Sequence, residues 1–468
     1  MDDNTVSEIE EKMVGGGVAR PAINAFLNSV RRVADGATGM VAENEIDPVA
    51  ELPSLESLPG ATGDAGALLN QLAVIKLNGG LGTGMGLDRA KSLIAVKGDE
   101  TFLDFIAHQI SYLRKQASAP KLSFYLMNSF STQTDSLDYL AKHAGLALDD
   151  ELDFLQSKAP KLDADTLKPV NWPAQPDLEW CPPGHGDLYP SMLGSGLLNR
   201  LLERGVKYLF VSNSDNLGAT VDLRLLEYFA TSELSFLMEV CGRTEADKKG
   251  GHLARGKSDG HLLLRESAQC PKEDESSFQD IGLHRFFNTN NLWIRLDHLK
   301  TELEKHGGSL PLALITNRKT VDPRDASSTK VLHLECAMGA AIECFERSGA
   351  VSVPRDRFAP VKTTADLLAL RSDAYVVTDD FRLVLDGTRA GRPPVIELDS
   401  RHYKLMDGFE ACVAKGVPSL LSCHSLKVTG EVFFEPDIVL SGKVEIVNES
   451  GGRKCVPAGN YADTTVKL

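Results

Sequence analysis

Residues 73–96 read AVIKLNGGLGTGMGLDRAKSLIAV, and this stretch decides which fold class to expect. Two apolar runs, residues 73–77 and 93–96, flank a loop that holds five glycines among eight residues. Glycine lets backbone N–H groups approach an anion without a Cβ in the way, and Lys91 adds a positive charge after the loop. The pattern predicts a buried strand whose end is delivered to a phosphate-bearing ligand.

Neither of the two common glycine-loop templates matches this stretch. In the dinucleotide template G-x-G-x-x-G, Met85 or Arg89 falls where the last glycine is required. In the P-loop template, Ala90 stands where a glycine must precede Lys91. A surface loop between two strands is therefore the alternative for this stretch taken alone, and a dehydrogenase that binds NAD is disfavoured.

The bulk composition indicates a globular protein with an excess of negative charge. The chain has 468 residues, of which 42% are hydrophobic, and a formal net charge of −15. From the length we expect about three domains. The charge argues against nucleic acid and anionic membranes as partners. Eight cysteines without a CxxC pair favour reduced thiols over disulfides or a zinc site.

The sequence carries no sign of export or membrane insertion. The N-terminus, MDDNTVSEIEEKM, is acidic and lacks the apolar core of a secretory signal. No run reaches the roughly 20 apolar residues that a membrane-spanning helix needs. We therefore expect a soluble, cytoplasmic protein with no membrane partner.

Apolar runs alternate with amphipathic stretches between residues 71 and 375, which predicts an α/β fold. We expect strands at residues 73–77, 123–128, 208–212, 235–240, 261–265 and 291–294, and helices at 101–116, 132–144, 190–204, 223–230 and 332–347. Such an alternation favours a mostly parallel sheet, and ligands bind such sheets beyond the carboxyl ends of the strands. The tails of these strands are therefore the places to search for a site.

The two flanking regions differ from this central part. Residues 1–35 show helical spacing of apolar residues, and residues 43–66 form a connector rich in Pro, Ser, Glu and Gly. After about residue 376 the pattern changes to short strands, expected at 426–428, 432–434, 438–440 and 444–447. We therefore expect a helical N-terminal segment, a catalytic domain and a small β-helix-like domain, at residues 1–70, 71–375 and 376–468.

Two segments carry charged side chains suited to a polyphosphate. The strand at 208–212 leads to Asp215, whose carboxylate suits Mg²⁺ completed by phosphates and waters; an Asx turn or a helix cap is the alternative. Lys362 precedes an expected helix N-terminus, capped by Thr363 or Thr364, where an anion is favoured. An ordinary surface lysine is the alternative there.

Two further segments suit a polar ligand such as a sugar. In WCPPGHGD, residues 180–187, prolines restrict the loop and glycines expose the backbone on both sides of His185; a plain turn is the alternative. The amides of FNTNN, residues 287–291, suit sugar hydroxyls, with turn formation as the alternative. No sequence pattern supports covalent catalysis or a structural metal.

In chain order, these segments resemble the eukaryotic-type UTP–glucose-1-phosphate uridylyltransferase family. The shared motifs, which span about residues 70–375, are KLNGGLGTGMG…KS, FLDF, LMNSF, WCPPGHGDLY, FVSNSDNLGATVD, FNTNNLW and FAPVKTT. The related UDP-N-acetylhexosamine enzymes carry an arginine in this glycine loop (GGQGTRLG), whereas residues 80–86 here read GLGTGMG. The short N-terminus and the tail at 464–468 depart from the family pattern, and a homo-oligomer is compatible with the sequence.

The resemblance implies a Rossmann-like, GT-A-like nucleotidyltransferase core and a role for each motif. UTP would be bound by Leu77, Asn78, Gly79, Gly80, Lys91, Gln156, Gly184, Asp215 and Lys362. The sugar or its phosphate would be bound by Gly79, Gly80, His185, Asn213, Ser214, Asp215 and Asn290, with Glu266 and Gly250 as further contacts. Asp215 would be the ligand of Mg²⁺, the expected cofactor, and Lys91, Lys362 and Asp215 would be the catalytic residues.

The implied reaction converts UTP and glucose 1-phosphate reversibly into UDP-glucose and pyrophosphate. The attacking phosphate oxygen is already an anion, so direct in-line attack on the α-phosphorus needs charge neutralisation and alignment rather than a general base. The alternatives are a pyrophosphorylase of broader or different sugar specificity, for galactose or N-acetylhexosamine phosphates, and a non-catalytic nucleotide-sugar binding protein. Retention of Lys91, Asp215 and Lys362 disfavours the last of these.

Overall fold

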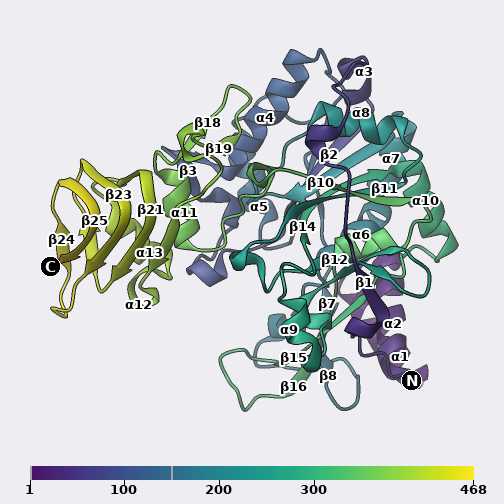
Figure 1. Ribbon diagram of the computed structural model, residues 1–468. Helices are drawn as coiled ribbons and strands as arrows, with labels where there is room; N and C mark the ends of the chain where they lie inside the picture. Colours follow the sequence, from purple (N-terminus) through teal and green to yellow (C-terminus); the bar gives the residue numbers. More distant parts are fainter. Residues whose placement is uncertain (1–2, 149–150) are drawn as a thin grey trace.

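A ten-stranded mixed sheet forms the centre of the computed structural model, which describes residues 3–148 and 151–468 (Figure 1). Its strands are β1 (Ile46–Pro48), β2 (Leu72–Asn78), β5 (Ser123–Asn128), β6 (Asp153–Leu155), β10 (Tyr208–Asn213), β11 (Phe236–Gly242), β12 (His252–Gly256), β13 (Leu262–Arg265), β14 (Phe286–Arg295) and β17 (Ser348–Ser352). The path β10-β2-β5-β6 is parallel, as expected. β14 runs antiparallel to β10 and β11, so the sheet as a whole is mixed rather than mostly parallel.

Helices cover both faces of the parallel strands, which is why these strands are mainly apolar. Along β2, Val74 packs into a core with α4 (Phe102–Gln116), α8 (Leu223–Thr231) and α11 (Thr364–Arg371). Its neighbours Ala73 and Ile75 pack into the opposite core with α6 (Leu188–Gly194), α7 (Leu197–Glu203) and α10 (Leu296–Lys305). Successive strand residues point to opposite faces, so two cores hold the sheet between two helical layers.

The carboxyl ends of three parallel strands meet at one edge of the sheet. Asn78, the last residue of β2, is in register with Asn128 of β5, and Leu77 is in register with Asn213 of β10. The strands at 73–77, 123–128 and 208–212 are confirmed with boundary changes of at most one residue. The segments that follow them therefore start side by side.

Two predicted helices are wrong as continuous helices. The helix expected at 190–204 is broken between α6 and α7, because Gly196 has a φ of +76°, in the left-handed region that ends a helix. The helix expected at 332–347 is instead β16 (Lys330–Cys336) followed by a 3₁₀ segment, Met338–Glu343. β16 pairs with β15 (Leu314–Thr320) and β8 (Leu162–Asp163), and this pairing outweighs an apolar spacing that suits either structure.

The N-terminal helices α1 (Asp3–Gly15) and α2 (Arg20–Ala34) confirm most of the helix expected over residues 1–35. A short non-helical link at residues 16–19 joins them, and residues 1 and 2 lie outside the described part. They share a core with β15 and β16. The remaining short elements before residue 386 are α3 (Ala65–Leu69), β3 (Ala95–Lys97), β4 (Glu100–Thr101), α5 (Gln133–Leu140), β7 (Ala159–Pro160), β9 (Trp180–Cys181), α9 (Glu275–Phe278), β18 (Tyr375–Val377) and β19 (Leu383–Leu385).

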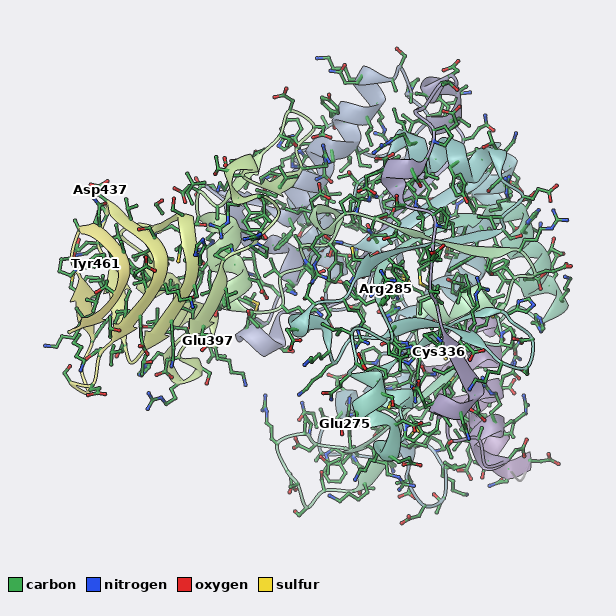
Figure 2. The ribbon with its side chains drawn as sticks, in the orientation of Figure 1. Glu275, Arg285, Cys336, Glu397, Asp437 and Tyr461 are labelled. Atoms are coloured by element: carbon green, nitrogen blue, oxygen red, sulfur yellow. The ribbon has the colours of Figure 1, made fainter. Side chains whose placement is uncertain are left out.

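The C-terminal part is an arm of parallel strands at one side of the molecule (Figure 1). β20 (Val395–Leu398), β21 (Ser419–Thr429), β23 (Ile438–Val447) and β25 (Gly459–Lys467) form one sheet in chain order, and β22 (Val432–Phe434) pairs with β24 (Lys454–Val456). Helices α12 (Ser400–Tyr403) and α13 (Met406–Val413) lie between β20 and β21 in the chain. Figure 2 shows Asp437 and Tyr461 on this arm and Cys336 in the body.

Two C-terminal strand predictions are wrong in their extent. The strands expected at 438–440 and 444–447 are one strand, β23, because Gly442 (φ +66°) bends the chain at a register shift without ending the pairing. All eight cysteines are free thiols in the structure. None of the helices in residues 3–148 and 151–468 has both the length and the apolar character to cross a membrane.

Candidate active site

An ion pair joins two of the predicted catalytic residues. Lys91, which follows the glycine loop, places its Nζ 2.6 Å from Oδ2 of Asp215, beyond the end of β10. The same Nζ donates to the carbonyl oxygen of Val361. Both charged side chains are 20% exposed, so the pair lies at a surface that a ligand can reach. Tertiary structure thus brings the segment that carries Lys362 to the same point.

Asn216 fastens the Asp215 loop to the segment before Lys362. Its Nδ2 donates to the carbonyl oxygen of Arg357 (3.1 Å), and its Oδ1 accepts from the N–H of Ala359 (3.0 Å). The carbonyl oxygen of Asp215 accepts from the N–H of Val361 at 3.3 Å. Asn216 was not among the predicted site residues, although its position directly after the carboxylate was a signal that it could serve the same loop.

Lys362 is exposed and stands directly before helix α11, as predicted. Thr363 is the cap: its Oγ1 accepts from the N–H of Asp366, whose carboxylate accepts from the N–H groups of Lys362 and Thr363. Thr364, the other candidate cap, instead donates to Tyr403. Asp366 occupies part of the positive helix end, so the side chain of Lys362, rather than the helix terminus, is the group left for an anion.

The glycine loop is closed at its base and open at its tip. The N–H of Lys91 donates to the carbonyl oxygen of Gly80 (3.3 Å), which closes the loop. A Cβ at Gly79 would come within 2.6 Å of Oε1 of Gln156, whereas a Cβ at Gly80 or Gly84 would meet no atom within 4 Å. A side chain at Gly79 would therefore displace the Gln156 amide, whereas the backbone at Gly80 and Gly84 faces open space.

Asn78 and Ser214 form a buried polar junction between β2 and β10. Ser214 Oγ donates to Asn78 Oδ1 (3.0 Å), and Asn78 Nδ2 donates to Asn128 Oδ1 and to Ser136 Oγ, both at 2.8 Å. The N–H of Ser214 donates to the carbonyl oxygen of Leu77 (3.1 Å). The side chains of Asn78 and Ser214 are thus used within the protein.

Gln156 and Gly184 lie together, as the predicted uracil-binding residues should. Gln156 Nε2 donates to the carbonyl oxygen of Gly184 (3.0 Å), and its backbone N–H donates to Asn128 (2.7 Å). Gly184 has a φ of +80°, and a Cβ there would be 2.5 Å from the carbonyl oxygen of Cys336. Only glycine fits this position, which explains the glycine in the WCPPGHGD loop.

Asp187 holds this loop in place through two hydrogen bonds, and it was not among the predicted site residues. Its Oδ2 accepts from the N–H of Ser157 (2.7 Å) and from Oγ of Ser191 (2.6 Å). Burial raises the pKa of Asp187 to about 7, and these hydrogen bonds oppose the increase. Because Ser157 follows Gln156, Asp187 ties the uracil-side residue to the histidine loop.

His185 is held as a neutral hydrogen-bond donor. Its Nδ1 accepts from the N–H of Met338 (2.9 Å), so in the neutral ring the proton resides on Nε2. Burial lowers the pKa of His185 to about 4, which keeps the ring uncharged at neutral pH. The described residues offer Nε2 no partner. The residue is therefore suited to donate to a sugar hydroxyl or a phosphate oxygen.

A bulge in β14 presents Asn290. Glu239 of β11 pairs with Asn291 and Val240 with Asn288, which leaves Thr289 and Asn290 out of register. Asn290 has a φ of +59°, and its Oδ1 accepts from Nδ2 of Asn288 at 2.8 Å. Bulges of this kind re-aim side chains next to active sites.

The carboxylate of Glu266 lies next to the glycine pair at residues 250–251. A Cβ at Gly251 would be 2.5 Å from Oε2 of Glu266, and Gly250 donates to Asp247 (2.8 Å). Burial raises the pKa of Glu266, and the positive charge of Lys362 opposes this increase. Glu266 and Lys362 are therefore within electrostatic reach of each other.

Asn213 is half-buried at the end of β10, and its carbonyl oxygen accepts from the N–H of Asn216.

Asp215 is the residue predicted to hold a metal ion. The described portion of the chain contains no group of three or more His, Cys, Asp or Glu residues that could hold a metal ion. Oδ2 of Asp215 is paired with Lys91, and Oδ1 accepts no hydrogen bond from residues 3–148 or 151–468. One available carboxylate oxygen fits Mg²⁺, which usually keeps waters and takes substrate phosphates as further ligands.

Comparisons with known proteins agree with this geometry. A family model described as UTP–glucose-1-phosphate uridylyltransferase matches residues 23–441. The curated enzyme of that name from Encephalitozoon cuniculi is 40% identical over 428 residues, which cover 91% of this chain and 83% of the relative.

Solved structures match over the whole chain. The open and closed structures of the UDP-glucose pyrophosphorylase from Leishmania major align with a TM-score of 0.94 and 49% identity, covering 100% of both chains. A variant of that enzyme in complex with UDP-glucose aligns with a TM-score of 0.93 and 49% identity, again over 100% of both chains. The chain therefore belongs to the UTP–glucose-1-phosphate uridylyltransferase family of nucleotidyltransferases.

Proposed function

We propose that this protein transfers the uridylyl group of UTP to glucose 1-phosphate, reversibly, to give UDP-glucose and pyrophosphate. The observation that carries the proposal is the contact of Lys91 with Asp215 and with Val361, next to Lys362, at the edge where β2 and β10 end. An exposed glycine loop, two lysines and one carboxylate at the ends of parallel strands suit a triphosphate. The Leishmania relative that binds UDP-glucose supports the choice of ligand.

The chain's own groups supply neutralisation and alignment. Backbone N–H groups of residues 77–80 bind UTP, and Gln156 and Gly184 hold its base. Neutral His185 donates to glucose 1-phosphate, with Asn213, Asn290, Gly250 and Glu266 around the sugar. A sugar phosphate oxygen forms a bond to the α-phosphorus while the bond from the α-phosphorus to the bridging oxygen breaks, and pyrophosphate leaves with that electron pair. Lys91 and Lys362 offset the negative charge that is brought together.

Mg²⁺ is the proposed cofactor, held by Asp215 together with phosphate oxygens of the substrates. When bound, it would neutralise phosphate charge and favour departure of pyrophosphate. Lys91, which is paired with the other oxygen of the same carboxylate, keeps Asp215 directed at the phosphate site.

The wider organisation of the chain completes the proposal. We assign residues 1–70 to the N-terminal segment, 71–375 to a GT-A-like catalytic domain, and 376–468 to a C-terminal domain. The parallel pairing of β20, β21, β23 and β25 in chain order supports a short β-helix for the last of these. The cytoplasm is the proposed compartment.

The decisive experiment incubates the purified chain with UTP, glucose 1-phosphate and MgCl₂ and quantifies UDP-glucose and pyrophosphate. Product formation that EDTA abolishes and Mg²⁺ restores is expected. Parallel reactions with galactose 1-phosphate and N-acetylglucosamine 1-phosphate measure the sugar preference. A folded protein that releases no pyrophosphate with glucose 1-phosphate would overturn the proposed function.

A further inference from the structure

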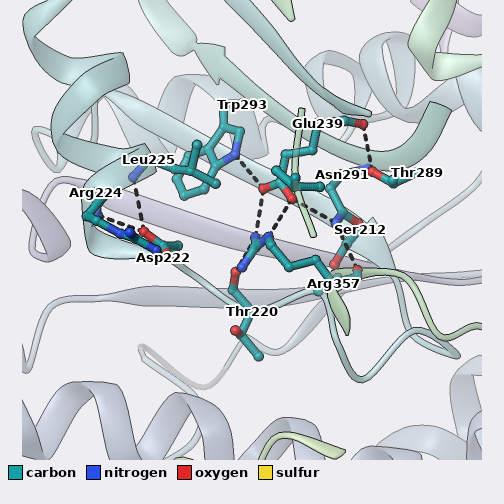
Figure 3. A network of polar contacts seen from close by, with 12 residues as sticks. Ser212, Thr220, Asp222, Arg224, Leu225, Glu239, Thr289, Asn291, Trp293 and Arg357 are labelled. Atoms are coloured by element: carbon teal, nitrogen blue, oxygen red, sulfur yellow. Dashed lines mark hydrogen bonds and ion pairs between the residues drawn. The ribbon is translucent and has the colours of Figure 1, made fainter. Parts of the chain in front are cut away.

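Glu239 in β11 is a fully buried carboxylate whose hydrogen bonds are all made inside the protein (Figure 3). Its Oε1 accepts from Trp293 Nε1 (2.9 Å) and Arg357 Nη2 (2.8 Å). Its Oε2 accepts from Arg357 Nε (2.8 Å) and Asn291 Nδ2 (3.0 Å). The two-pronged contact with Arg357 restricts the guanidinium to one orientation. None of the proposed contacts with substrate uses this pair.

Arg357 connects this buried carboxylate to the active-site loops. The residue is 4% exposed and lies five positions before Lys362. Its Nη2 donates to the carbonyl oxygen of Thr220 (2.8 Å), and its own carbonyl oxygen accepts from Asn216 Nδ2 (3.1 Å). A Cβ at Gly218 would be 2.1 Å from the carbonyl oxygen of Asp356, so the two backbones touch here. Residues 216–220 and 356–359 are thus locked together.

Lys76 adds a second buried tie to the same loop. It is 2% exposed, and its Nζ donates to Ser212 Oγ (2.7 Å) and to the carbonyl oxygen of Ala219 (2.6 Å). Burial and the positive charge of Arg357 lower the pKa of Lys76, and Glu239 opposes the decrease, so that the pKa is about 7. Lys76, Glu239 and Arg357 therefore form one electrostatic cluster, which we call the inner charge group.

The inner charge group is distinct from a second, more exposed set of charged residues. We call this second set, Lys91, Asp215 and Lys362, the outer charge group. Hydrogen bonds join the two groups. The side chain of Asn216 donates to the carbonyl oxygen of Arg357 and accepts from the N–H of Ala359, and the N–H of Val361 donates to the carbonyl oxygen of Asp215. A buried ion pair is weak evidence for stability, because apolar residues of similar volume often stabilise a core equally well. A charged, two-pronged pair does, however, specify one geometry, which apolar contacts do not.

We propose that Glu239 and Arg357 are positioning residues: they hold residues 357–362 against residues 213–220 so that Lys362 and Asp215 face the same triphosphate. This inference rests on the proposed function of Lys362. Neither side chain touches substrate, and both act through the backbone of the segment that carries Lys362. A shift of about 1 Å in the position of a catalytic group, even when the mutated residue does not touch the substrate, is enough to reduce turnover on the order of 10²-fold.

The test is a double-mutant cycle between Arg357→Lys and Lys362→Ala. Arg357→Lys keeps the charge but loses the two-pronged contact with Glu239, and we expect kcat at saturating substrates to fall about 10–100-fold. In the Lys362→Ala background the same substitution should lower kcat by a clearly smaller factor, since one of the two groups that it positions is already gone. Thermal unfolding of each variant is measured in parallel.

Arg389 provides the matched control. It is also buried, in the C-terminal part, and donates to the carbonyl oxygens of Leu420, Leu421 and Cys423. Arg389→Lys should lower the unfolding temperature while leaving kcat per folded protein unchanged in both backgrounds. Asn216→Ala is the second test variant, because it removes the link to the Lys362 segment without disturbing a buried charge. It should show the same non-additivity with Lys362→Ala.

Each outcome decides the proposal. If the losses from Arg357→Lys and Lys362→Ala multiply, Arg357 does not act through Lys362 and the proposal fails. It also fails if Arg357→Lys lowers only the unfolding temperature, as the control does. If Arg357→Lys does not fold, Asn216→Ala decides the question by the same criterion. A folded wild-type protein without pyrophosphate release would instead reject the proposed function itself, which is a different result.

Discussion

The inner and outer charge groups have nearly the same composition, one carboxylate and two cations, yet the structure treats them in opposite ways. In the inner group, Glu239 accepts four hydrogen bonds and is out of contact with water. In the outer group, Asp215 uses one oxygen for Lys91, and Lys362 is exposed. Full satisfaction fixes a geometry, whereas incomplete satisfaction leaves charge for a ligand. The first group is therefore suited to positioning and the second to chemistry.

The largest expected effect, on the free energy of unfolding, comes from removing the carboxylate of the inner charge group. Glu239→Ala leaves the guanidinium of Arg357 buried without a counter-charge, and we expect the free energy of unfolding to fall by about 3–5 kcal/mol. Denaturant titration measures it. Replacing Glu239 and Arg357 together by Met should recover most of that stability but not the wild-type kcat. Full recovery of both would mean that the pair contributes nothing to geometry.

The next largest effect, on kcat, comes from removing a lysine of the outer charge group. Lys362→Ala or Lys91→Ala should lower kcat on the order of 10²–10³-fold, by analogy with loss of one oxyanion donor. For the exposed Lys362 the free energy of unfolding should change by less than about 0.5 kcal/mol. Steady-state kinetics and a denaturant titration check both points. Lys427→Ala, an exposed lysine of the C-terminal arm, is the control and should change neither quantity; near-normal turnover of Lys362→Ala would remove Lys362 from the chemistry.

A smaller effect tests the neutral histidine beside the outer group. The folded pKa of His185 is about 4, against 6.5 for an ordinary histidine, so the unfolded state binds more protons between these values. Stability should therefore fall as pH decreases from 6.5 towards 4, by at most about 1.4 kcal/mol per pH unit from this group. His185→Asn keeps an acceptor for Met338 and should reduce that slope. An unchanged slope would show that His185 is not buried as a neutral ring.

The smallest effect concerns the glycine loop that leads to Lys91. A Cβ at Gly79 would lie 2.6 Å from Oε1 of Gln156 and should displace that amide from Gly184. Loss of about one hydrogen bond to the uracil would raise KM for UTP roughly tenfold, with little change in kcat. Gly15→Ala, in helix α1 with no atom near its Cβ, serves as the control. An unaltered KM for UTP in Gly79→Ala would argue against Gln156 as the base-binding residue.

The strands that build the site were predictable because they are continuous apolar runs bounded by turns. β5 follows its prediction to the residue, β2 extends its prediction by one residue at each end, and β10 extends its prediction by one residue at its carboxyl end. The helix at 332–347 was not predictable in this way, because strand pairing with β15 decides between two structures that the apolar spacing allows equally. The break at Gly196 depended on a left-handed conformation that many helical glycines do not adopt.

The sequence pointed most directly to candidate site residues where one residue type stood out in a motif. Lys91, Asp215 and the position of Lys362 before a capped helix belong to this class. Glu239, Arg357 and Asn216 were missed, although a lone acid in the apolar strand FLMEVCG is a usable signal of a buried partner. The identity of that partner, 118 positions away, had no counterpart in local sequence.

The sequence by itself determined the parallel strands, the glycine loop and the family, because apolar periodicity, backbone freedom at glycine and ordered motifs are properties of short segments. Only the tertiary structure decided which charge meets which. Lys91 pairs with Asp215 because β2 and β10 are adjacent and in register, and Lys362 arrives there because Arg357 is held by Glu239. Charge pairing depends on distance in space, and in this protein the sheet register and the buried ion pair set that distance.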